Sequence, residues 1–295
     1  MSVVPLVEDK LYALSNAYAV DGRVSWHPPG ARGVAPMTVY LFRAEQEDLL
    51  VDTGLSVHRE QVLADLSELG AGDQGRDFSL VTLRSGEFDS ICNLAPIART
   101  IPLSHVYSFH PDGIFWGDMH PAEPFDPSQG DSLGTPERSN VATASEIVLR
   151  GSAARQIRVL KPELRLLYTN WLYDEATRTL LTSDSFTWVI RPEGAAADRD
   201  WRVSAEHDRT TVEDIREHLL QTRFWWIADA DLFDVRAQLE SIFDSLAIDR
   251  IAPSFGCILE GREVVEHHVQ MLDAVLAEQG RKTPLRPADA GAQRA

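Results

Sequence analysis

Short apolar runs separated by polar turns fill the first third of the chain, and this pattern is typical of β-strands. Strands are predicted at residues 11–18, 37–43 and 48–52. The polar stretch AEQE between the last two predicts a hairpin. Residues 58–69 carry apolar side chains at helical spacing instead. A strand at 79–83, a polar loop and a helix from 89 to about 98 are predicted to follow.

The second half of the chain repeats this order of elements. Strands are predicted at residues 146–149, 156–160 and 164–168. The stretch LYDEATRTLLTSDSF predicts two strands joined by a polar turn, with Asp184 in the loop after the second. Residues 211–246 and about 262–277 have helical patterns, and IDRIAPSFG between them is predicted to be a short buried strand. Helices that follow both halves favour a sheet core with helices packed outside.

Two segments lack a regular pattern. Residues 105–140 are rich in Pro, Gly, Asp and Ser, and they are longer than the about 12 to 15 residues of an ordinary structureless loop. We expect them to form an insert, and we expect residues 281–295 to be a disordered tail. Residues 1–280 are predicted to be a single domain.

Composition narrows the classes of partner. Hydrophobic residues make up 44% of the chain, which is ordinary for a globular protein. The 28 Lys and Arg against 45 Asp and Glu give a net charge of −17, which disfavours nucleic acid and anionic membranes as partners. No secretory signal or spanning apolar run is evident, so a cytoplasmic location is expected. The two cysteines, Cys92 and Cys257, form no disulfide framework, and the sequence assigns them no role.

Several strand ends carry acidic residues. Asp52 follows residues 48–51, Glu87 and Asp89 follow the strand at 79–83, and Asp184 follows a strand in the second half. Loops at strand ends often hold metal ligands and catalytic carboxylates. The stretch LRSGEFDS at 83–90 contains no histidine, so the sequence leaves open a metal site, an altered site or a solvated turn.

Together these segments resemble the metallo-β-lactamase superfamily, and within it the diiron domain of flavodiiron proteins. LLVDTG at 49–54 is similar to the first motif, in which Asp52 steadies the metal loop, and residues 85–90 fall where the flavodiiron branch has HxExDH. LYDEATRTLLTSDSF and FWWIADADLF followed by IAPSFG are similar to later segments. The resemblance covers about residues 37–260 and implies a metallo-β-lactamase-like αβ/βα four-layer sandwich, an α/β fold.

Compared with the family's metal site, this sequence has the carboxylate ligands but not the histidine ligands. The positions of carboxylate ligands hold Glu87, Asp89 and Asp184. The positions of histidine ligands hold Ser85, Ser90 and Phe255, and one more falls on or near Arg165. Imidazole suits iron and zinc, carboxylates alone suit hard cations, and a guanidinium cannot coordinate a metal. We therefore expect no conventional diiron centre.

A cluster of carboxylates needs compensation by a positive charge or a proton. Arg165, Arg84, one divalent metal ion or a proton could supply it, and the main hypothesis is a carboxylate/arginine pocket built by Glu87, Asp89, Asp184 and Arg165. The resemblance also places the 105–140 insert over the pocket. There, Trp116 would act in an apolar lid, or His120 with Asp118 would provide replacement metal ligands.

Three functions stay open at this point. The first is a divergent protein that uses the pocket for small-molecule binding or altered chemistry. The second is a metal-dependent hydrolase or oxidoreductase that uses Glu87, Asp89 and Asp184 with ligands from the insert. The third is a non-catalytic, homodimeric structural or regulatory protein, because the family's diiron domains often dimerise. We expect no flavin domain, and the sequence identifies neither a substrate nor whether the protein is a catalyst.

Overall fold

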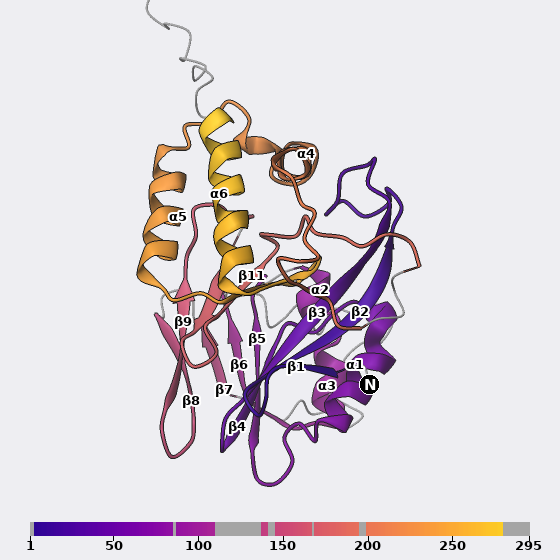
Figure 1. Ribbon diagram of the computed structural model, residues 1–295. Coiled ribbons are helices and arrows are strands. Elements are labelled where there is room, and N and C mark those ends of the chain that lie inside the picture. Colours follow the sequence, from indigo (N-terminus) through magenta and orange to yellow (C-terminus); the bar gives the residue numbers. More distant parts are fainter. Residues whose placement is uncertain are drawn as a thin grey trace, which may run out of the picture.

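The computed structural model describes residues 3–84, 87–109, 137–140, 145–166, 168–194 and 199–279, with the backbone alone at 137–140. These residues form two β-sheets with helices outside them (Figure 1). Ser85, Trp116 and His120, together with the predicted tail, lie outside the described residues.

Sheet A comes from the first half of the chain and has seven strands among the described residues. In spatial order these are β1 (Val3–Val7), β2 (Leu11–Val20), β3 (Gly33–Arg43), β4 (Glu47–Val51), β5 (Asp77–Thr82), β6 (Leu103–Ser108) and β7 (Glu137–Asn140). The strands from β1 to β4 pair antiparallel, and those from β4 to β7 pair parallel. The parallel strands therefore end at one common edge.

Sheet B comes from the second half and also has seven strands among the described residues. In spatial order these are β12 (Arg202–Val203), β14 (Ile258–Glu260), β13 (Arg250–Pro253), β11 (Thr179–Ser183), β10 (Trp171–Asp174), β9 (Arg155–Leu160) and β8 (Glu146–Leu149). Strands β11 and β13 are parallel neighbours, so their carboxyl ends lie side by side. An isolated bridge between Met37 and Phe255 connects the two sheets near this point.

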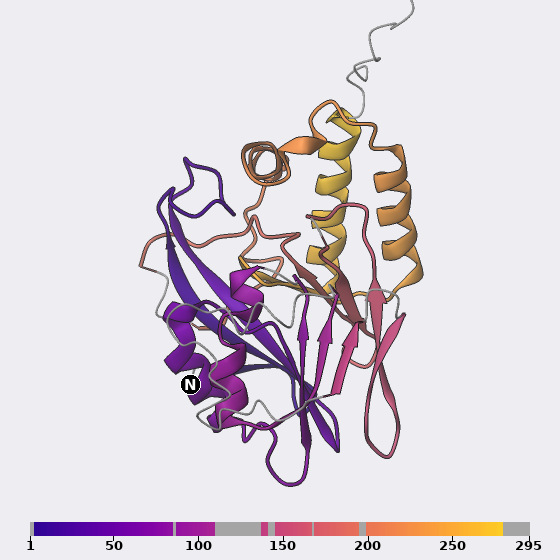
Figure 2. The same cartoon turned by 180° about the vertical axis from the view of Figure 1, so that it is seen from behind.

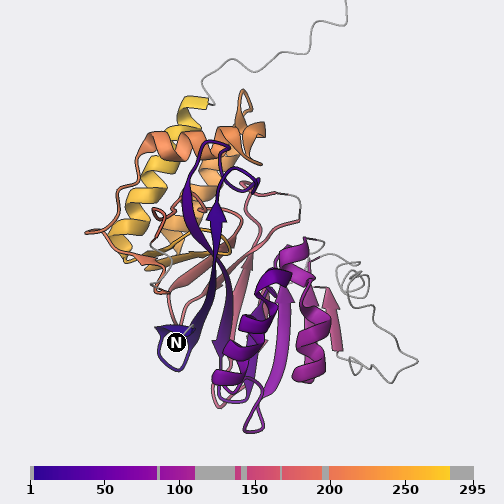
Figure 3. The same cartoon turned by 90° about the vertical axis from the view of Figure 1, so that its right-hand side faces the viewer.

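Helices cover the outer face of each sheet. The helices are α1 (Arg59–Glu68), α2 (Phe88–Ile91), α3 (Leu94–Thr100), α4 (Val212–Gln221), α5 (Phe233–Ser245) and α6 (Arg262–Gln279), with short 3-10 helices η1 (Ser56–His58) and η5 (Trp225–Ile227). Figure 3 shows the purple helices α1 to α3 on one side and the orange and yellow helices α4 to α6 on the other, and Figure 2 shows the same layers from behind. This is the αβ/βα sandwich that the family resemblance implies.

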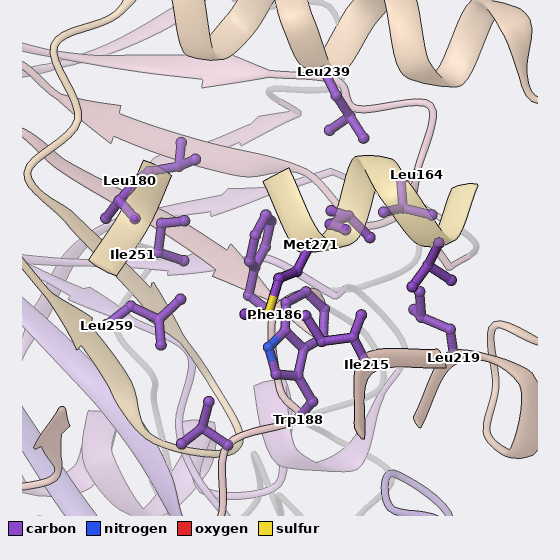
Figure 4. Close-up of a cluster of buried hydrophobic side chains, with 14 of the residues drawn as sticks. Leu164, Leu180, Phe186, Trp188, Ile215, Leu219, Leu239, Ile251, Leu259 and Met271 are labelled. Atoms are coloured by element: carbon purple, nitrogen blue, oxygen red, sulfur yellow. The ribbon is translucent and has the colours of Figure 1, made fainter. Parts of the chain in front are cut away.

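Three clusters of buried apolar side chains hold these layers together. One lies between the two sheets, where Phe42 and Val51 of sheet A pack with Ile157 and Leu181 of sheet B. A second joins sheet A to α1 and α3. The third joins sheet B to α4, α5 and α6, and Figure 4 shows Phe186, Trp188 and Met271 at its centre.

Most predicted elements are present, but three predictions need correction. Residues 164–168 were predicted to form a strand, but the described part of this segment bends, with turn-like hydrogen bonds such as Thr169 N to Leu166 O at 3.0 Å. The single helix predicted from residue 89 divides into α2 and α3, because the Asn93 amide donates to the carbonyls of Thr53, Gly54 and Leu55.

The third correction concerns residues 105–140, which are predicted to form an insert without regular structure but begin and end in β-strands. Residues 105–108 belong to β6, and residues 137–140 form β7, which pairs with it. The remaining part, 110–136, lies outside the described residues. No helix in the described part of the chain is long and apolar enough to cross a membrane.

Candidate functional site

The carboxyl ends of β4, β5, β11 and β13 carry the polar residues that the sequence singles out. Asp52 follows β4, Arg84 and Asp89 follow β5, Asp184 follows β11, and Phe255 follows β13. The connections are tight: Asp52 N donates to Val81 O at 2.8 Å and Ser254 N donates to Ser183 O at 2.7 Å. The ends of both sheets therefore converge on one site.

Two loops at this site adopt left-handed backbone conformations without glycine. Asp52 has a φ of 61°, Ser183 one of 56° and Phe186 one of 64°. A left-handed conformation is uncommon for residues other than glycine and is retained when the surrounding contacts fix it. For Asp52 one such contact is the hydrogen bond from Leu83 N to its Oδ1 at 2.8 Å.

An arginine lies at the centre of the site. The guanidinium of Arg84 forms an ion pair with Asp89, and each side chain is only 1% exposed. The same guanidinium lies over the ring of Phe255, 4.9 Å from its centroid. A buried ion pair is costly to desolvate and holds only when both charges are present, so Arg84 and Asp89 depend on one another.

The charge of Arg84 also acts on the two other buried aspartates. Burial raises the pKa of Asp184 to about 6, and Arg84 and then Arg223 oppose this rise, together with a hydrogen bond from Thr169 Oγ1 to Asp184 Oδ2 at 3.1 Å. Burial likewise raises the pKa of Asp52, with Arg84 again opposing. Asp184 Oδ1 is buried without a hydrogen-bond partner among the described residues. Three aspartates thus share one buried cation.

Glu87 lies at the outer side of this cluster. Its Oε1 accepts a hydrogen bond from Arg223 Nη2 at 2.6 Å, and the two side chains are 25% and 27% exposed. Arg223 follows helix α4, far from Glu87 in the sequence. This second ion pair lies at a partly exposed position, where solvent screens the attraction between its charges.

Aromatic side chains form the remaining wall. Phe255 is fully buried and stacks on Trp26, with ring centroids 3.9 Å apart and planes at 19°, while Tyr18 meets its edge at 6.2 Å. Tyr18 and Trp26 come from the β2–β3 hairpin and its tip. The ring at the predicted histidine position therefore fills space and excludes water from the Arg84 side chain.

The structure brings together Asp52, Asp89, Asp184 and Phe255 around Arg84, with Glu87 beside them and Ser90 fully buried in α2. Among the described residues, the arginines that pair with these carboxylates are Arg84 and Arg223, so the role predicted for Arg165 stays a prediction. The sequence offers no signal for Arg223. Nor does it single out Tyr18 and Trp26.

Both cysteines are buried and protonated at neutral pH. Cys92 Sγ donates to Gly54 O at 3.0 Å, and burial raises its pKa to about 11. Burial raises the pKa of Cys257 to about 12, with Arg191 opposing. A nucleophilic thiol needs a lowered pKa, so neither side chain has the environment of a reactive cysteine.

The metal-binding capacity of the site follows from its donors. In the described part of the chain, no group of three or more His, Cys, Asp or Glu side chains is arranged to hold a metal ion. The nitrogen atoms next to Asp89 and Glu87 belong to guanidinium groups, which cannot act as ligands. These residues do not fit a dinuclear metal centre.

No known family model matches the sequence, and no curated protein sequence matches it either. Solved structures do match in fold. A metal-soaked Flv1 flavodiiron core from Synechocystis sp. PCC6803 has a TM-score of 0.60 at 15% identity, over 92% of this chain and 60% of its own. Rubredoxin oxygen:oxidoreductase from Desulfovibrio gigas has a TM-score of 0.60 at 13% identity, over 93% and 61%.

A shorter structure matches over nearly its whole length. It is a 254-residue fragment of a protein named as a diflavin flavoprotein from Nostoc sp. PCC 7120, with a TM-score of 0.64 at 16% identity, over 94% of this chain and 95% of the fragment. The chain thus spans about 60% of the first two proteins and nearly all of the fragment. It has the metallo-β-lactamase-like fold, in the form found in flavodiiron cores.

Proposed function

We propose that this chain is a divergent flavodiiron-fold protein in which ion pairs occupy the place of a dinuclear metal centre, and that it acts as a binding or regulatory protein. The observation that carries the proposal is the buried pair of Arg84 and Asp89 beneath Phe255. A cation at Asp89 would have to displace a guanidinium that is itself fully buried.

The charges of the site support this proposal. Arg84 and Arg223 place two positive charges among the carboxylates of Asp52, Glu87, Asp89 and Asp184, which is the electrostatic role of bound cations. A guanidinium does not polarise a substrate oxygen as a Lewis acid does, and it generates no metal-bound hydroxide. The proposed site keeps positive charge next to its carboxylates and loses metal chemistry.

Metal analysis of the purified protein tests this directly. The chain is produced in medium supplemented with iron, zinc and manganese, and the metal content per chain is measured for wild type, Glu87→Ala and the exposed control Glu213→Ala. We expect substoichiometric metal in all three. Stoichiometric metal in wild type and the control that is lost in Glu87→Ala would instead support the metal-dependent alternative, with further ligands from residues 110–136.

A small-molecule role of the ion-paired site has its own test. A ligand screen by thermal shift is expected to find compounds whose stabilisation is weakened in Asp184→Ala, and Arg165→Ala reports whether the predicted arginine takes part. Stabilisation that is equal in wild type and Asp184→Ala would place the ligand elsewhere in the molecule.

Self-association is a second candidate role, favoured by exposed aromatic side chains. Trp225 of η5 is 67% exposed and Phe233 at the start of α5 is 76% exposed. Large apolar side chains at a surface often mark an interface. Light scattering of wild type and Trp225→Ala tests a homodimer: a dimer that dissociates in the variant supports this role, and a monomeric wild type rules it out.

A further inference from the structure

A cavity of about 1060 Å³ lies apart from the ion pairs, among the tip of the β2–β3 hairpin, residues 188–192, strand β12 and helix α4. Figure 1 shows the hairpin tip rising beside α4. Small-molecule sites usually have about 300–1000 Å³. Arg84, Asp89 and Asp184 do not line this cavity, but Tyr18, which lies against Phe255 of the ion-paired site, is hydrogen-bonded to His27 in the cavity wall.

Two buried histidines form its inner wall. The rings of His27 and His218 are 6.0 Å apart at 69°, and each side chain uses its Nε2 for a hydroxyl partner: Tyr18 Oη at 2.6 Å and Thr187 Oγ1 at 3.0 Å. Neither Nδ1 takes part in these two hydrogen bonds, so each imidazole can offer its second ring nitrogen to a ligand.

Both imidazoles are neutral at pH 7. Burial lowers the pKa of His27 to about 4, and it lowers that of His218 to about 3 with a further contribution from His27. A neutral imidazole donates at one ring nitrogen and accepts at the other, so it matches polar groups without demanding a charge. The wall is thus suited to an uncharged partner that carries hydrogen-bonding groups.

Trp188 supplies an aromatic surface in the same wall. Its ring meets the edge of His218 at 6.1 Å, and its Nε1 donates to His268 Nδ1 at 2.9 Å. His268 is in turn hydrogen-bonded to Asp208, which also lines the cavity. The indole is held in place by this chain of contacts, and a rigid aromatic side chain is a good partner for a planar ring.

Charged residues of both signs surround the cavity. Arg202 pairs with Asp200 and Glu260 pairs with Arg250, while Asp208 is hydrogen-bonded to His268, whose pKa is lowered by burial, and Asp214 to the uncharged Thr211 at the start of α4. Four arginines and five acidic residues line the cavity in total. The nearly balanced charges favour neither an anion nor a cation.

We propose that this cavity binds an uncharged, planar heteroaromatic molecule, of the chemical class that includes purine nucleosides and pterins, with its ring near Trp188 and its polar edge on His27 and His218. Such a ring carries both donors and acceptors, as the two imidazoles require. The volume accommodates a ring system with a small substituent.

Calorimetric titration with adenosine, guanosine and pterin as probes tests the proposal. The blocking variant is Gly30→Trp, because Gly30 lines the cavity and an added Cβ there meets no atom within 4 Å. The matched control is Ser67→Trp at an exposed position of α1. We expect saturable binding of at least one probe, a loss of affinity of about tenfold or more in Gly30→Trp, and unchanged affinity in Ser67→Trp.

A second variant locates the polar contacts. His218→Gln keeps a hydrogen-bonding side chain but moves its polar atoms, and we expect it to bind the probe about tenfold more weakly than wild type. In wild type, we expect the NMR signals of the His27 imidazole to shift when the probe is added. Thermal unfolding verifies that each variant is folded. Absence of binding by all three probes at millimolar concentration, or equal binding by Gly30→Trp and wild type, overturns the proposal.

Discussion

Replacing Arg84 by alanine is expected to destabilise the protein far more than loss of a surface arginine. Both members of the Arg84 and Asp89 pair are 1% exposed. After Arg84→Ala, Asp89 remains buried without its partner, and Asp52 and Asp184 lose the positive charge that opposes the rise of their pKa. Each effect penalises the folded state alone.

The expected magnitude follows from burial. Removing one partner of a buried ion pair costs about 3–5 kcal/mol. A domain of ordinary stability has about 5–15 kcal/mol in total, so the variant should retain its fold with a much reduced margin. Arg216→Ala is the matched control, because Arg216 pairs with Glu213 and Glu278, which are 71% and 54% exposed. That loss should stay below about 1 kcal/mol.

Urea unfolding at several pH values measures both quantities. The uncompensated carboxylates of Arg84→Ala have raised pKa values in the folded state, so the folded variant binds more protons than the unfolded chain at intermediate pH. The loss of unfolding free energy in Arg84→Ala relative to wild type should therefore be smaller at about pH 5 than at about pH 8. The double variant Arg84→Met with Asp89→Leu removes both charges, and we expect it to lie within about 1 kcal/mol of wild type or above it.

Two results would refute this reasoning. The first is an Arg84→Ala loss no larger than that of Arg216→Ala, which would mean that Asp89 finds water or another partner. The second is a deficit that stays constant between about pH 8 and about pH 5, because a buried carboxylate without a partner must respond to protons.

The remaining predictions concern single residues. The pKa of Asp184 is raised from 3.8 to about 6, so wild type should lose about 3 kcal/mol of stability as pH rises through this window. Asp184→Asn cannot ionise and should not show this loss. In urea unfolding, the stability of Asp184→Asn relative to wild type should therefore be higher at about pH 7 than at about pH 4. Gly33→Ala should cost more than about 1 kcal/mol in thermal unfolding, because its Cβ would lie 2.2 Å from Arg191 O at a φ of 148°, whereas Gly30→Ala should be nearly neutral. Phe255→Ala should cost about 3–5 kcal/mol in urea unfolding by opening a cavity beside Trp26, and a loss below about 1 kcal/mol would contradict its role as the buried wall.

The sequence predicts the elements that local pattern determines. The alternation in β8 and the long helix α6 are found close to their predicted bounds, because period-2 and helical patterns report burial on one face. Strand β12 has only two residues and is defined by its pairing with β14, a contact that local pattern cannot reveal. Residues 164–168 are apolar enough for a strand, yet the described part bends toward Thr169 and the site.

The same division holds for the candidate site. Resemblance and strand-end position select Asp52, Asp89, Asp184 and Phe255, and these residues do gather around one point. The sequence does not show which arginines pair with these carboxylates, because it contains many arginines and their spacing does not distinguish one candidate from another. Arg223 lies 136 residues from Glu87, so only the tertiary fold brings them together.

The loops explain how an arginine can take up this position. Asp52 and Ser183 have left-handed backbone conformations at the ends of their strands. These strand ends bring several carboxylates together, and a nearby positive charge is needed to compensate them. The guanidinium of Arg84 supplies a positive charge at this centre through its ion pair with Asp89, and a guanidinium cannot coordinate a metal. The buried pair of Arg84 and Asp89 fills this centre, while the cavity of about 1060 Å³ beside α4 offers space for the ligand that we propose. If the proposed function is correct, we expect ligand binding at this cavity rather than metal chemistry at the strand ends.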